Sequence, residues 1–144
     1  MSKHAAYYKE PENIPSFWCS SIEDVDGLVD TVVRKGSVSV IGRSAGGRPI
    51  KAVSYGTPRS SKGSTTYSGA LGARDVTAYL GEEAALRVIM FVGAIHGGEF
   101  EGIVGLSNLI SVLETGADLR GRKQPGIIQA AGMVDRIIIV PIAN

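Results

Sequence analysis

The strongest constraint on the fold is one stretch near the middle of the chain, from Arg87 to Gly102. It begins with five consecutive apolar residues, Val88 to Val92, and such a run without alternation is typical of a strand that is buried on both faces. Glycines follow, and beyond Glu99 the apolar residues recur at helical spacing. The stretch therefore predicts a buried strand, a glycine-rich turn and the start of a helix, which is where open α/β sheets place their ligand sites.

Two side chains in this turn, His96 and Glu99, form a His-x-x-Glu pattern. A neutral imidazole and a carboxylate are both good zinc ligands, and the two glycines between them allow both side chains to reach one point. The pattern alone is common, and its plainer interpretation is a loop histidine followed by an acid that favours a helix start. His96 and Glu99 are therefore the candidate metal ligands, and Zn²⁺ is the candidate metal.

Composition describes an ordinary globular chain. With 144 residues, 44% of them hydrophobic, the chain is long enough to bury a core within one domain. A net charge of +1 gives no electrostatic reason to expect a nucleic acid or an anionic membrane as a partner. The single cysteine, Cys19, excludes an internal disulfide, and with the lack of an apolar leader it favours a cytoplasmic location. No apolar stretch approaches the ~20 residues that cross a bilayer.

The first half of the chain predicts an irregular segment, a helix and a hairpin. Residues 1–20 contain prolines that interrupt any helix. Ser20 or Ser21 then begins a helix whose apolar face runs to about Lys35, and Ser21-Ile-Glu-Asp24 resembles a capping box. Residues 37–56 predict two strands joined by the turn-rich segment from Gly42 to Pro49. That segment lacks the phosphate-loop pattern and leads into a strand, so we interpret it as a hairpin.

The second half predicts a crossover unit. Residues 57–72 are rich in Ser, Thr and Gly and predict an exposed loop, and residues 73–85 predict a short helix. After the central strand and helix, residues 125–133 predict an amphipathic helix and residues 137–142 a second interior strand. The order strand, helix, helix, strand favours an α/β sheet with a crossover connection.

Three motifs, in order, resemble the N-terminal half of the catalytic domain of the M14 family of zinc carboxypeptidases. They are the hairpin Ile41-Gly-Arg-Ser-Ala-Gly-Gly-Arg-Pro-Ile50, the turn Gly93-Ala-Ile-His96-Gly-Gly-Glu99, and the strand end Ile139-Val-Pro-Ile-Ala-Asn144. The similarity runs from about Ile22 to the end of the sequence. It implies a three-layer α/β/α fold around a mixed sheet, with residues 1–20 as an irregular segment before the domain 21–144.

The resemblance also implies an activity. His96 and Glu99 match two of the family's three protein zinc ligands. The family's third ligand, general base, oxyanion arginine and substrate-carboxylate residues have no counterpart up to Asn144. Neither Arg136 nor Glu101 is a convincing substitute for them. We therefore expect a domain that is truncated at its C-terminus and a chain that is inactive on its own.

The expected function of the intact protein is that of a metallocarboxypeptidase, which removes the C-terminal residue of a peptide substrate. One alternative is a zinc amidohydrolase of the desuccinylase and aspartoacylase type, and the Gly42–Ile50 hairpin favours the peptidase. A non-catalytic binding domain on the same fold is a third interpretation. Because truncation would remove later strands and helices of the sheet, we expect the apolar strand 137–142 to present an unprotected edge or face through which copies of the chain self-associate.

Overall fold

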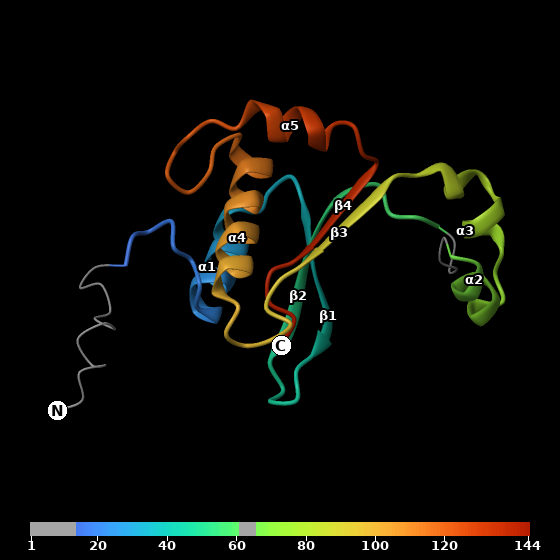
Figure 1. Cartoon of the computed structure of the whole chain (residues 1–144), viewed down its shortest axis with the longest axis horizontal. Coiled ribbons are helices and arrows are strands. Elements are labelled where there is room, and N and C mark those ends of the chain that lie inside the picture. The colour runs from blue at the N-terminus through green and yellow to red at the C-terminus, as the bar shows by residue number, and fades with distance from the viewer. Residues whose placement is uncertain (1–13, 61–65) are drawn as a thin grey trace, which may run out of the picture.

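The computed structural model describes residues 14–60 and 66–144, and within them the chain is an α/β protein with an open, mixed, four-strand sheet (Figure 1). The strand order is β1-β2-β4-β3. The strands are β1 (Ser37–Arg43), β2 (Pro49–Gly56), β3 (Val88–Val92) and β4 (Arg136–Val140). β2 pairs antiparallel with β1 and β4, whereas β3 and β4 run parallel. The prediction of an α/β fold with a mixed sheet is therefore confirmed.

The first two strands form the predicted hairpin. Their register runs from Ser37 opposite Ser54 to Arg43 opposite Pro49, with a bulge between Val40 and Gly42. A positive φ of 80° at Gly47 closes the turn, a conformation that glycine adopts without steric cost. The hairpin interpretation of this glycine-rich segment is therefore confirmed.

Helix α1 (Ile22–Val32) precedes the hairpin. The Ser21 side chain caps it by accepting a hydrogen bond of 3.0 Å from the backbone N–H of Asp24, as the sequence predicts. The helix ends three residues before Lys35, earlier than predicted. A long-range contact accounts for this early end. The backbone N–H of Lys35, which would otherwise continue the helix, donates instead to a carboxylate on another helix.

That carboxylate belongs to Glu114, which is buried in helix α4 (Phe100–Thr115). It accepts hydrogen bonds from the backbone N–H groups of Arg34 (3.0 Å), Lys35 (2.8 Å) and Gly36 (3.0 Å). Burial raises the pKa of Glu114, but these three donors outweigh burial and hold the pKa below its ordinary value. One side chain thus fixes the connection between α1 and β1.

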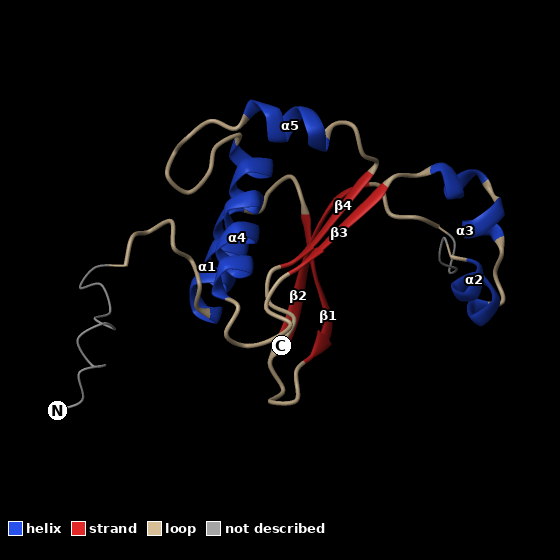
Figure 2. Cartoon of the chain, viewed as in Figure 1, coloured by secondary structure: helices blue, strands red, loops and turns tan. Residues whose placement is uncertain are grey.

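The parallel strands are joined by the predicted crossover. α4 follows β3, α5 (Pro125–Ala131) follows α4, and β4 completes the unit. Gly116 ends α4 with a φ of 84°, the left-handed conformation that is typical of glycine after a helix. α1 and α4 lie on the same face of the sheet (Figure 2).

The core lies between this helical face and the two central strands. Val53 of β2 and Ile139 of β4 are register partners, and both are fully buried. Apolar side chains of the two helices cover them, namely Val25 and Val29 of α1 and Ile103, Ile110 and Leu113 of α4. Burial of this apolar surface is the main force that holds α1 and α4 on the sheet.

Two predictions about strand burial are wrong. β3 forms as predicted, but it is an edge strand, and each of its five side chains is 38–55% exposed. β4 is an interior strand that pairs with β2 on one side and β3 on the other, which confirms the interior strand predicted there. The further expectation that this strand presents an exposed edge is wrong. An unbroken apolar run predicts a strand but does not tell which of two such strands is central.

The segment between β2 and β3 also differs from its prediction. Part of the expected loop forms helix α2 (Tyr67–Ala73), and α3 (Thr77–Leu80) and the 3-10 helix η2 (Glu82–Ala85) replace a single short helix. The Thr66 side chain caps α2 by accepting from the Gly69 N–H at 3.2 Å. The glycine and serine residues of this segment favour a loop by their helix propensity, so the sequence pattern did not predict this helix. Residues 61–65 of the predicted loop, and residues 1–13 of the predicted irregular segment, lie outside the described residues.

In the described ranges, 14–60 and 66–144, every helix is too short or too polar to span a membrane.

Candidate metal site

The candidate ligands lie in the turn between β3 and α4, at the carboxyl end of a parallel strand. Gly93 leaves the strand, and its N–H donates to the carbonyl of Val140 at 2.9 Å. Its own carbonyl accepts from the N–H of Ala143 at 3.0 Å. These two bonds join the ends of β3 and β4, so the turn that carries His96 is anchored to the centre of the sheet.

The backbone in this turn is tightly packed and strained. A Cβ atom on Gly93 would lie 2.6 Å from the Pro141 carbonyl oxygen and 3.1 Å from Leu106 Cδ1. Ala94 is buried and has a φ of 48°, a left-handed conformation that costs a non-glycine residue free energy. Such strain concentrates at functional sites, where the surrounding structure holds it. The turn is therefore built to place the residues that follow Ala94.

His96 and Glu99 face one another. Nδ1 of His96 lies 2.9 Å from Oε1 of Glu99, and the His96 N–H also contacts Oε2 at 3.5 Å. Because an ionised carboxylate only accepts hydrogen bonds, Nδ1 carries the proton in this contact. The side-chain hydrogen bond from His96 lowers the pKa of Glu99, and the backbone contact adds to that effect. The side chains of the two candidate metal ligands, His96 and Glu99, are thus brought together.

Glu99 does not act as a helix cap. It occupies the N-cap position of α4, but its side chain makes no hydrogen bond to the helix backbone, and Phe100 is the first helical residue. Glu99 thus precedes the first helical turn by one residue. Its carboxylate turns back to His96 and forms the i,i+3 contact with that side chain.

The site is open to solvent. The His96 side chain is 80% exposed and that of Glu99 is 56% exposed. A Cβ atom on Gly97 or Gly98 would meet nothing within 4 Å. A metal ion or a substrate can therefore approach both ligands without displacing protein atoms.

The donor set fits two positions of a zinc site. Two donors bound to one tetrahedral zinc at about 2.1 Å lie about 3.4 Å apart. The observed separation of 2.9 Å would widen by about half an ångström as the ion replaces the Nδ1 proton. Among the described residues no group of three His, Cys, Asp or Glu side chains is arranged to hold a metal. His4, the other histidine of the chain, lies outside those residues.

Arg136 lies away from the candidate ligands. It pairs with Val88, at the far end of the parallel strands from His96.

Asn144, the last residue of the third motif, contacts the turn that carries His96. Its side chain donates to the carbonyl of Ile95 at 3.4 Å. This contact was not predicted from the sequence.

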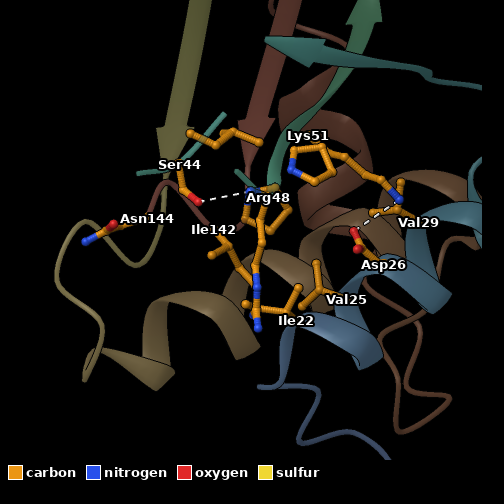
Figure 3. Close-up of a pocket in the computed structure, with 12 residues that line it drawn as sticks. Ile22, Val25, Asp26, Val29, Ser44, Arg48, Lys51, Ile142 and Asn144 are labelled. Carbon is orange, nitrogen blue, oxygen red and sulfur yellow. Dashed lines mark hydrogen bonds and ion pairs between the residues drawn. The ribbon is translucent and has the colours of Figure 1, made fainter. Parts of the chain in front are cut away.

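A small cavity of about 40 Å³ lies between α1, the hairpin and the residues that follow β4, including Ile142 and Asn144 (Figure 3). Lys51 lines it and pairs with Asp26 and Asp30 of α1, each at 3.1 Å. Burial lowers the pKa of Lys51, but the two carboxylates outweigh it and hold that pKa above its ordinary value. A cavity of this size holds about one water molecule, so this cluster serves to attach the hairpin to α1.

No protein-family model, no curated protein and no solved structure matches the chain.

Proposed function

We propose that this chain supplies the first two zinc ligands, His96 and Glu99, of a metallocarboxypeptidase-like hydrolase of the M14 type. One observation carries the proposal. The Nδ1 and Oε1 atoms of the His-x-x-Glu pair lie 2.9 Å apart at the carboxyl end of a parallel strand, on a strained and anchored turn. This contact brings an imidazole nitrogen and a carboxylate oxygen, which are both zinc-ligand types, close together.

The order of elements supports the same proposal. The M14-like motifs occupy the β1–β2 hairpin, the end of β3 and the end of β4, which are three parts of one sheet. The hydrogen bond from Asn144 to Ile95 brings the second and third motifs together. The finer fold we propose is the three-layer α/β/α arrangement, whose first helical layer is formed by α1 and α4.

The chemistry follows from the ligand types. Zinc, when bound, would polarise a scissile carbonyl and acidify a coordinated water. His96 and Glu99 would hold it through an imidazole nitrogen and a carboxylate oxygen. Gly97 and Gly98 leave the approach open for the C-terminal end of a peptide substrate. Within residues 14–60 and 66–144 no third ligand joins this pair. Because a catalytic zinc site has three protein ligands, we expect the 144-residue chain alone to be inactive as a peptidase.

Two alternatives share this chemistry or this fold. The same zinc chemistry would serve an amidohydrolase that acts on N-acyl amino acids, although the hairpin motif at Gly42–Ile50 favours the peptidase. The other alternative is a non-catalytic binding domain on the same fold.

The test is an assay of the zinc-loaded chain on peptides with free C-termini and on N-acyl amino acids, with products identified by mass spectrometry. Wild type, His96→Ala and Glu101→Ala are compared, because Glu101 is an exposed acid two residues beyond Glu99. We expect zinc binding that requires His96, with no turnover. Removal of C-terminal residues that is lost in His96→Ala would support the carboxypeptidase but contradict the expectation that the chain alone is inactive. Deacylation would favour the amidohydrolase, and zinc binding that does not require His96 would contradict the proposal.

A further inference from the structure

A second cavity lies between α5, the end of α4 and the two interior strands of the sheet. Its volume is about 300 Å³. α5 lies across the end of α4 (Figure 1) and contributes no buried residue, so this short helix covers the cavity without filling it. The walls are mostly apolar side chains, namely Tyr55, Leu113, Ile128, Ala131, Val134 and Ile137.

Arg136 gives this cavity an uncompensated positive charge. The residue lines the cavity, and its Nε atom is buried. Within residues 14–60 and 66–144 that atom has no hydrogen-bond partner, and no acid pairs with the Arg136 side chain. Buried polar groups of native proteins are nearly always bonded, so an unbonded one needs a partner that the chain itself does not supply. A guanidinium group is suited to a carboxylate, to which it donates two parallel hydrogen bonds.

The other ionisable groups at the cavity leave this charge in place. Asp135 also lines it, but its Oδ2 accepts from the backbone N–H of Arg87 at 2.7 Å and pairs with Nε of Arg87 at 3.2 Å. These bonds lower the pKa of Asp135, which is therefore ionised and already paired. Burial, and then the charge of Glu114, raise the pKa of Tyr55 well above its ordinary value, so its phenol is neutral at pH 7.

The cavity lies at the opposite end of the sheet from the metal turn. Arg136 pairs with Val88 at the start of β3, whereas Asn144 contacts Ile95 beyond the end of that strand. β2 and β4 form its floor, and none of its lining residues belongs to β3. A strand added to the outer side of β3 would therefore leave the walls of this cavity unchanged.

We propose that this cavity binds an aliphatic monocarboxylate, with the carboxylate on Arg136 and the chain against the apolar walls. At roughly 30 Å³ for a group the size of a water molecule, the cavity accommodates about ten non-hydrogen atoms. In the described part of the chain no second cation lines it, so a ligand with two charges would bury one of them unpaired. This argument is independent of the proposed zinc site.

The experiment is a methyl NMR titration of the metal-free chain with octanoate, an aliphatic carboxylate of about this size, up to about 10 mM. Acetate and 1-octanol separate the carboxylate from the chain. Arg136→Gln removes the guanidinium group, and Arg122→Gln removes the same charge from an exposed arginine outside the cavity. We expect one octanoate site with a Kd of about 1 mM or below in wild type and in Arg122→Gln. In Arg136→Gln, and for both control ligands, we expect binding at least about fivefold weaker.

The methyl signals also locate the ligand. We expect those of Leu113 and Ile137, which line the cavity, to follow one saturating curve. Val38 and Val40 are exposed apolar residues of β1, so their unchanged signals would exclude general adsorption to apolar surface. Ala131→Leu fills the cavity from α5 and should weaken binding with Arg136 still present.

Three outcomes would overturn the proposal. The first is no saturation by octanoate at the highest concentration. The second is equal affinity in wild type and Arg136→Gln, or for octanoate and 1-octanol, because the carboxylate would then have no partner in Arg136. The third is binding that leaves Leu113 and Ile137 unchanged or that Ala131→Leu does not weaken, because the ligand would then lie elsewhere.

Discussion

The backbones of Gly93 and Pro141 touch where β3 and β4 end. A Cβ atom on Gly93 would lie 2.6 Å from the Pro141 carbonyl oxygen, closer than real Cβ atoms come to any neighbour. Gly93 also donates to Val140 and accepts from Ala143. The turn that carries His96 can therefore keep its position only if residue 93 has no side chain.

The first prediction concerns this contact. Gly93→Ala forces the two strand ends apart, and we expect it to lower the free energy of unfolding by about 2–3 kcal/mol, as overpacking of a tight site does. Gly97→Ala is the control, because a Cβ atom there meets nothing within 4 Å. Chemical denaturation of both variants measures the difference. Equal stability of the two would show that the contact is not a constraint.

The second prediction concerns Glu114, whose carboxylate accepts from three backbone N–H groups. Glu114→Gln removes the charge, and we expect a loss of about 2 kcal/mol at pH 7. Glu101→Gln, an exposed acid on the same helix, is the control, with an expected change within about 0.5 kcal/mol. The measurement is urea denaturation.

The contribution of Glu114 to the free energy of unfolding should depend on pH, and the direction of that dependence follows from its pKa. Its folded-state pKa lies below the ordinary value of 4.5, so the ionised group contributes stability above that pH. The contribution is lost as pH falls through the folded pKa. The stability gap between wild type and Glu114→Gln should therefore be constant from pH 7 to about pH 5 and shrink below pH 4.5. A gap that widened on acidification would contradict this account.

The third prediction concerns Lys51, which bridges Asp26 and Asp30. Lys51→Met retains much of the apolar stem but leaves two carboxylates unpaired. Because the aspartates are partly exposed, we expect a loss of at most about 1 kcal/mol at low salt. In 1 M NaCl the loss should fall to less than half, because salt screens both the pair and the repulsion that replaces it. A salt-independent loss would indicate a packing effect.

The sequence predicted the elements that depend on local patterns and missed features that depend on distant residues. The Ser21 cap, the hairpin and the pairing of His96 with Glu99 each involve residues a few positions apart. The early end of α1 depends on Glu114, 78–80 residues away, and no periodicity signals that contact. Likewise β3 and residues Ile137–Val140 of β4 are both unbroken apolar runs, and only the order of the strands in the sheet decides which is buried.

The site was predictable to the same extent. The type and spacing of His96 and Glu99 were readable because both lie in one turn. Neither the left-handed conformation of Ala94 nor the contact of Asn144 with Ile95 has a sequence signal that could have been read. Ala94 in particular occupies a conformation that glycine would be expected to fill.

The most direct test of the central claim is zinc titration calorimetry of wild type, His96→Ala, Glu99→Ala and Glu101→Ala. Two ligands on an anchored turn predict binding of about one zinc per chain that is lost in His96→Ala and Glu99→Ala and retained in Glu101→Ala. Binding that neither ligand substitution alters, or no binding at all, would contradict the claim that this turn is a metal site.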